Sequence, residues 1–80
     1  MKAIVTGGNR GIGLEISKKL LARGFEVHVL SRTGIDSAPE GIISWTADIS
    51  DYEQTIKIVD RIGSLDVLIN NAGIMNAKTA

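Results

Sequence analysis

The sequence has no cysteine, one proline and only three aromatic residues among its 80 residues. Without cysteine, the chain cannot form disulfides, thiolate zinc sites or iron–sulfur clusters, and it has no cysteine nucleophile. His28 is the sole histidine and has only scattered carboxylates for company, so we expect no metal site.

An excess of charge of either sign is also absent, because nine basic residues balance nine acidic ones. No basic field exists to attract nucleic acid or anionic lipid, so we expect neither a nucleic acid nor a membrane as a partner. Long apolar runs and a signal-peptide pattern are lacking as well, which favours a cytoplasmic protein.

The residues that are present are those of an ordinary globular protein, with 44% hydrophobic and 22% charged residues. This composition excludes a disordered chain. A chain of this length can bury roughly 60% of its surface and supports at most one small domain.

Strand and helix patterns alternate along the chain. Short, almost wholly apolar segments predict buried strands at Ala3–Val5, Val27–Leu30, Ile42–Thr46 and Leu65–Ile69. Helical periodicity predicts helices over Gly11–Arg23 and from behind Ser50 to near Gly63, and residues 33–41 are expected to form a loop. Right-handed crossovers then predict an α/β fold: a parallel four-stranded sheet of order 3-2-1-4 with one main helix on each face.

Local patterns add detail to the two helices. Residues 50–53 have the form of a capping box, in which the Ser50 hydroxyl accepts from the amide of Glu53. Apolar spacing predicts that the inward face of the first helix carries Ile12, Ile16 and Leu20, with Leu21 beside them. In the second helix it predicts Tyr52, Ile56 and Val59, with Ile62 as a further candidate.

A glycine-rich turn joins the first strand to the first helix. Residues 6–13 read Thr-Gly-Gly-Asn-Arg-Gly-Ile-Gly, and such a turn aims free helix amides at an anion. Gly7 permits a tight turn, Gly11 allows backbone to approach a pyrophosphate, and Gly13 allows close helix–strand packing. The alternative is a merely flexible turn. A P-loop is excluded, since no Gly-Lys-Ser/Thr follows.

Three motifs together resemble the short-chain dehydrogenase/reductase family. The Thr-Gly-x-x-x-Gly-Ile-Gly turn is similar to its cofactor turn, and Asn70-Asn71-Ala72-Gly73 after the fourth strand matches its second marker. Asp48, just past the third strand, stands where the family places an aspartate at the adenine. The resemblance covers essentially all 80 residues and implies the N-terminal half of a Rossmann domain.

The resemblance also implies which residues touch a dinucleotide. Amides of the glycine turn would hold the pyrophosphate, Asp48 would accept from the adenine amino group beside the Ile49 amide, and Asn71 would border the ribose. Asp48 could instead serve only to start a helix, and the asparagines could be structural. The expected cofactor-binding residues are Gly7, Asn9, Arg10, Gly11, Ile12, Gly13, Ser31, Arg32, Asp48, Ile49, Asn71, Ala72 and Gly73.

The end of the second strand bears on which cofactor binds. NAD-preferring folds place a carboxylate about 20 residues after the glycines, where it accepts from the ribose 2′-hydroxyl. This chain has Ser31-Arg32 there, and a guanidinium suits a 2′-phosphate. With Arg10 as a second cation, the sequence predicts NADP(H) over NAD(H), although either arginine could be a solvated surface residue. Asp36 is the nearest competing acid.

No catalytic residue is expected in these 80 residues. The family's Tyr-x-x-x-Lys pair is not matched at Tyr52, because Ile56 stands four residues later. We therefore expect residues 1–80 to be the N-terminal part of one domain whose C-terminal catalytic part is absent, and to be inactive alone. The parent would interconvert a small carbonyl and an alcohol. The alternative is a non-catalytic nucleotide-binding or assembly module complete at 80 residues.

The strand over Leu65–Ile69 is expected to lie at one edge of the sheet. An unpaired, strongly apolar edge strand is a site of association, so the sequence predicts a homo-oligomer.

Overall fold

Four strands and two helices make up the fold in a computed structural model that describes residues 1–7, 11–34 and 39–71. The elements in chain order are β1 (Lys2–Thr6), α1 (Gly11–Ala22), β2 (Glu26–Ser31), β3 (Ile42–Thr46), α2 (Tyr52–Ile62) and β4 (Val67–Asn70). Each predicted element is present, with ends that differ from the prediction by at most two residues.

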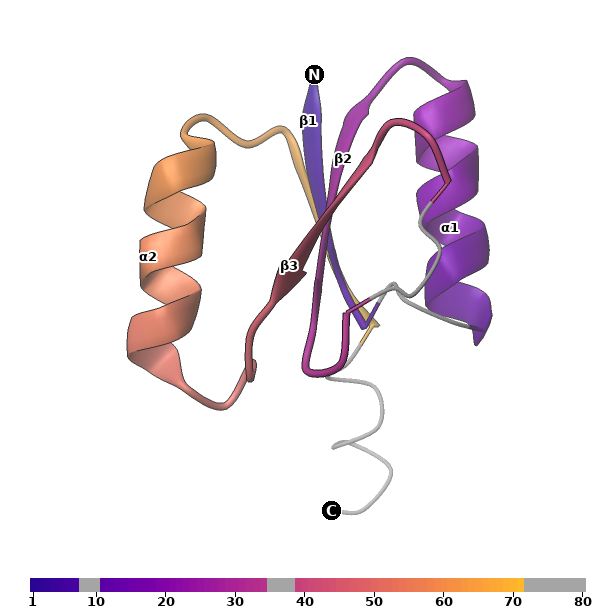
Figure 1. Cartoon of the computed structure of the whole chain (residues 1–80). Helices are drawn as coiled ribbons and strands as arrows, with labels where there is room; N and C mark the ends of the chain where they lie inside the picture. Colours follow the sequence, from indigo (N-terminus) through magenta and orange to yellow (C-terminus); the bar gives the residue numbers. More distant parts are fainter. Residues whose placement is uncertain (8–10, 35–38, 72–80) are drawn as a thin grey trace.

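The four strands form one parallel sheet in the order β3-β2-β1-β4. Figure 1 shows α1 and α2 on opposite sides of this sheet, so that the molecule has three layers. The predicted α/β class, strand order and helix placement are therefore confirmed.

Each side of the sheet has its own apolar cluster. On the α1 side, Val5, Val27 and Val29 are fully buried beneath side chains of α1. On the α2 side, Ile4 and Leu30 pack against Ile62. The central strands β1 and β2 are buried on both faces, which explains why their centres are mostly apolar rather than alternating, with His28 as the polar exception.

The inward face of α1 differs from the prediction. Gly13 and Ser17 are its buried residues, whereas Ile12 is 75% exposed and Ile16 is only half-buried. The helix thus turns its smallest side chains toward the sheet, whereas Leu20 and Leu21 cover the sheet beyond them, as predicted. Close approach is possible because the Ser17 hydroxyl is satisfied within the helix, donating to the Gly13 carbonyl at 2.9 Å.

The inward face of α2 is also rotated from the prediction. Ile58, Val59 and Ile62 pack on the sheet, whereas Tyr52 is 76% exposed and Ile56 is exposed. Val59 and Ile62 were placed correctly, and the face runs through Ile58 rather than Ile56. The described part of the chain contains no helix of the length and apolarity needed to span a membrane.

The start of α2 corrects the predicted capping box. Asp51 is the N-cap, and its carboxylate accepts from the Gln54 amide at 3.2 Å. Ser50 instead donates from its amide and its hydroxyl to Asp48. Both residues are good caps by type, but the turn that contains Asp48 uses the Ser50 side chain and leaves the cap to Asp51.

Removing the cap gives a direct test of this correction. We expect Asp51→Ala to destabilise the fold by about 1 kcal/mol, because one helix amide loses its acceptor. Such a loss lowers the melting temperature of a chain of this size by roughly 4–8 °C, measured by circular dichroism. Ser50→Ala is the control. If Ser50→Ala cost as much stability as Asp51→Ala, Asp51 would not be the principal cap.

A polar network crosses the apolar layer on the α2 side. Trp45 donates from Nε1 to His28 Nδ1 at 2.9 Å, and His28 Nε2 lies 2.7 Å from a Glu26 carboxylate oxygen. Because Trp45 is only a donor, Nδ1 of His28 accepts and Nε2 carries the proton donated to Glu26. This hydrogen bond is the main cause that lowers the pKa of Glu26. His28 is thus a buried residue with both ring nitrogens hydrogen-bonded.

Candidate functional site

The carboxyl ends of all four strands are tied together by hydrogen bonds. The Gly7 amide donates to the Leu30 carbonyl at 2.8 Å, which joins the turn after β1 to the end of β2. The Ala47 amide donates to the Ser31 carbonyl at 2.9 Å and joins β3 to β2. The Thr6 hydroxyl donates to Asn70 Oδ1 at 3.1 Å and joins β1 to β4. Ligands of open parallel sheets bind at this edge.

The glycine turn requires residues that tolerate left-handed backbone. Gly7 has a φ of 68° and Gly11 a φ of 59°, values that residues other than glycine rarely adopt. Among the described residues, no atom lies within 4 Å of a Cβ built on Gly11, so these residues leave the backbone there open to a ligand. The first turn of α1 carries no acidic residue, which leaves its free amides able to receive an anion.

Gly13 is required for a different reason, which is space. A Cβ at Gly13 would overlap the Gly7 carbonyl oxygen and would lie 2.8 Å from Asn71 Nδ2. The Asn71 side chain donates to that same Gly7 carbonyl at 3.2 Å. α1, the glycine turn and the end of β4 therefore meet at one point, and Asn71 has a structural role there.

The end of β2 presents a hydroxyl and a guanidinium. Ser31 is buried, and its Oγ accepts from the Gly34 amide at 2.9 Å. With that lone pair occupied, the hydroxyl hydrogen is directed elsewhere and can donate to another group. Arg32 follows at the surface and is exposed. The pair is equipped to donate to an anion with several acceptor oxygens.

Asp48 is held in one orientation by the residues that follow it. Ser50 donates to its Oδ1 twice, from the hydroxyl at 2.7 Å and from the amide at 3.0 Å. The Asp48 amide donates to Gln54 Oε1 at 3.2 Å. The two bonds from Ser50, followed by the charge of Arg32, lower the pKa of the Asp48 carboxyl, so that it is a carboxylate at neutral pH. Among the described residues, no hydrogen bond is made to Oδ2, which can therefore accept from a ligand.

Nine of the predicted site residues lie in the described part of the chain, and all nine belong to this edge of the sheet or to the first turn of α1. Asn9, Arg10, Ala72 and Gly73 lie outside the described residues. Ile49 is half-buried and packs its side chain into the α2-side cluster, which anchors the backbone beside Asp48. Sequence reasoning missed the positioning roles of Ser50 and Gln54, for which the only signal was the polar character of residues 48–54.

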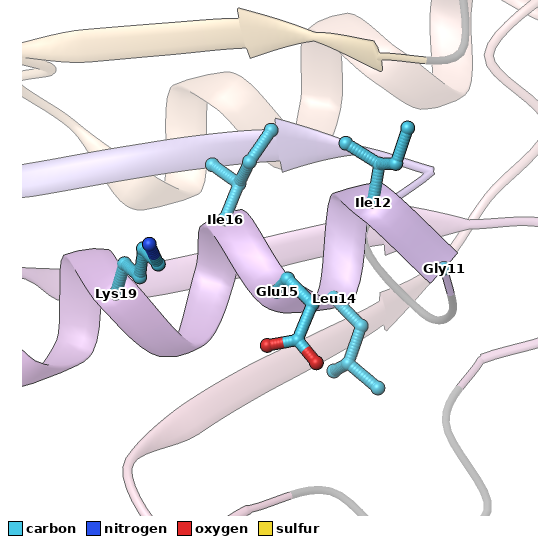
Figure 2. Close-up of a pocket in the computed structure, with 6 residues that line it drawn as sticks. All are labelled: Gly11, Ile12, Leu14, Glu15, Ile16 and Lys19. Atoms are coloured by element: carbon cyan, nitrogen blue, oxygen red, sulfur yellow. The ribbon is translucent and has the colours of Figure 1, made fainter.

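The described residues fit a dinucleotide. An open glycine backbone and free helix amides suit a pyrophosphate, and an oriented carboxylate suits an amino group on a base. An adjacent hollow of about 570 Å³ lies along α1 and is lined by Ile12, Ile16, Leu14, Glu15, Lys19 and Gly11. Figure 2 shows Ile12 and Ile16 on one side of the helix, with Leu14 and Glu15 on another. The walls of this hollow are mostly apolar and do not suit phosphates, which we place instead at the N-terminal end of α1.

Comparisons with known proteins agree with this geometry. The family model for short chain dehydrogenases matches residues 1–80. The chain is 43% identical over 82 residues to an acetoacetyl-CoA reductase of Shinella zoogloeoides, a match that covers 90% of this chain and 34% of the relative. It is 35% identical over 86 residues to a 3-dehydrosphinganine reductase of Arabidopsis thaliana, covering 95% of this chain and 26% of the relative.

A solved structure gives the same result in three dimensions. The menthone neomenthol reductase of Mentha piperita superposes with a TM-score of 0.72 at 32% identity, over 88% of this chain and 30% of that one. The chain thus spans about a quarter to a third of the length of the relatives it matches. The glycine turn, the strand order and these matches agree, and the chain belongs to the short-chain dehydrogenase family of oxidoreductases.

Proposed function

We propose that this chain is the NADP(H)-binding portion of a short-chain oxidoreductase that interconverts a carbonyl compound and an alcohol. The observation that carries the cofactor preference is the end of β2, where Arg32 follows a buried serine and no carboxylate stands at either position. A carboxylate there would accept from a 2′-hydroxyl and repel a 2′-phosphate, whereas a guanidinium binds the phosphate. Both relatives described above are named as reductases, which supports a carbonyl substrate in the whole protein.

Each part of the cofactor has a place in this proposal. Amides at the start of α1 bind the pyrophosphate, with Gly11 leaving room for it. Asp48 Oδ2 accepts from the adenine amino group, and the Ser31 hydroxyl and Arg32 donate to the 2′-phosphate. The nicotinamide of the bound cofactor supplies or accepts the hydride. These 80 residues contain no Tyr-x-x-x-Lys pair, so binding without turnover is proposed for the chain by itself.

The experiment is a calorimetric titration of the chain with NADPH and, in the same buffer, with NADH. We expect NADPH to bind more tightly, since its 2′-phosphate alone engages Arg32. An equal affinity for the two cofactors, or a tighter complex with NADH, would contradict the preference. Absence of binding by both would contradict the proposed function as a whole.

We also propose that the chain self-associates through β4. Among the described strands, β4 pairs only with β1, and Leu68 in it is 59% exposed. An apolar strand at the edge of a sheet favours pairing with a second copy.

We expect Leu68→Lys to shift the chain toward monomer in sedimentation equilibrium over a concentration series, because a charge on an edge strand opposes pairing. The matched control is Ile43→Lys on β3, the opposite edge, where Ile43 is also exposed. A monomeric parent, or an equal effect of the two substitutions, would argue against association through β4.

A further inference from the structure

Arg32 and Asp48 each follow the end of one of two neighbouring strands. β2 and β3 are paired with Ser31 opposite Thr46, and the Ala47 amide donates to the Ser31 carbonyl at 2.9 Å. Arg32 is the next residue after Ser31, and Asp48 is the next after Ala47. The hydrogen bond between the strand ends therefore fixes the two backbones side by side, with a cation on one and an anion on the other.

The two side chains differ in how firmly they are held. The Asp48 carboxylate is fixed by two hydrogen bonds from Ser50, and its backbone is tied to α2 through Gln54. Arg32 is exposed, and no contact ion pair holds it among residues 1–7, 11–34 and 39–71. A long, exposed guanidinium beside a fixed carboxylate is attracted toward it. The positive charge of Arg32 also lowers the pKa of the Asp48 carboxyl, after the larger effect of the Ser50 hydrogen bonds, which agrees with this placement of the two residues.

A 2′-phosphate and the Asp48 carboxylate would both attract the guanidinium of Arg32. We propose that Asp48 limits the preference for NADP(H), because its carboxylate competes with the 2′-phosphate for Arg32 and repels that phosphate. This inference rests on the proposed function. Asp48 thus has two opposed effects: its acceptor oxygen serves the adenine of both cofactors equally, whereas its charge weakens only the cofactor that carries the extra phosphate.

The test is Asp48→Asn, which removes the charge and preserves the shape of the side chain. We measure the ratio of the Kd for NADH to the Kd for NADPH by calorimetry, because loss of the adenine acceptor cancels in that ratio. We expect the ratio to rise about 1.5- to fivefold at low salt, the range for exposed charge pairs. The rise should shrink at high salt, where exposed charges are screened. A ratio that stays constant or falls would overturn the inference.

Glu53→Gln is the matched control, because Glu53 is an exposed carboxylate in the first turn of α2 and makes the same change of charge. We expect it to leave the ratio unchanged. An equal rise in Glu53→Gln would mean that net charge alone is responsible, and the role of Asp48 would be wrong.

Arg32 itself supplies the second measurement. In an Arg32→Ala background, Asp48→Asn should raise the ratio by clearly less than in the parent, whereas an equal rise would overturn the competition for Arg32. Titration with adenosine 2′,5′-bisphosphate and with 5′-AMP repeats the comparison on ligands that differ only in the 2′-phosphate. A parent that binds neither dinucleotide contradicts the proposed function. Retained binding with an unchanged ratio contradicts this inference alone.

Discussion

Replacing Gly13 with alanine is expected to destabilise the chain, although alanine is the better helix former. In an open helix position the substitution would stabilise by about 1 kcal/mol. Here the added methyl would overlap the Gly7 carbonyl oxygen and lie 2.8 Å from Asn71 Nδ2. The Gly7 carbonyl is backbone, and the Gly7 amide is hydrogen-bonded to the Leu30 carbonyl, so Gly7 cannot move without disturbing the sheet edge. The net effect is therefore a loss of stability.

The expected loss is about 1–3 kcal/mol, the usual cost of overpacking a well-packed site. For a chain of this size each kcal/mol lowers the melting temperature by roughly 4–8 °C, which circular dichroism resolves easily. Affinity for a dinucleotide should fall as well, because the methyl pushes the first turn of α1 away from the glycine turn. A variant as stable as the parent, or more stable, would show that the close approach of α1 to the glycine turn does not constrain residue 13.

Gly11→Ala separates space from backbone strain. Gly11 has a positive φ, so alanine costs roughly 1–2 kcal/mol there, but its Cβ would meet no atom of the described residues within 4 Å. The side-chain amide of Asn71, which donates to Gly7, is the reporter in NMR spectra. We expect this resonance to move in Gly13→Ala and to stay in Gly11→Ala. Equal movement in both variants would point to general loosening rather than to a local clash.

The sheet could be predicted from the sequence because its signals are strong and local. β1 has an uninterrupted apolar centre and β2 an apolar centre broken only by His28, and the crossover rule allows few strand orders. The helix faces were predicted less well for a physical reason. α1 buries Gly13 and Ser17, and a small buried residue gives no hydrophobic signal. In α2, the apolar residues Ile56, Ile58 and Val59 lie within one turn, so their spacing does not decide which of them faces inward. In the structure Ile58 and Val59 pack on the sheet and Ile56 is exposed.

The candidate site could be predicted as far as single residues at strand ends allow. Gly7, Ser31 and Asp48 each follow or finish a strand, so the parallel sheet brings them to one edge. The partners that orient them could not be predicted, because those depend on the path of short turns. Ser50 is a residue type that often caps helices, but its hydroxyl donates to the Asp48 carboxylate instead. Gly34 reaches back to Ser31 only because the chain turns after β2.

Arg32→Ala is expected to abolish most of the preference for NADPH over NADH. A hydrogen bond to a charged group contributes roughly 1.5–3 kcal/mol, which corresponds to about ten- to a hundredfold in affinity. The lower end of that range is expected, because Arg32 is exposed and solvent screens its charge. The affinity for NADH should change little, since a 2′-hydroxyl gives the guanidinium no anion to bind. Both affinities are measured by calorimetry on the same preparation.

Two further variants serve as controls for the effect of Arg32→Ala on cofactor preference. Arg23→Ala removes an equal charge directly after α1, at the end of the helix opposite the glycine turn, and should leave both affinities unchanged. Arg32→Lys retains the charge but loses the paired donors that match a phosphate, so its preference should fall between those of the parent and Arg32→Ala. If Arg32→Ala kept the discrimination of the parent, the 2′-phosphate would be bound by other groups. The assignment of cofactor preference to the end of β2 would then be wrong.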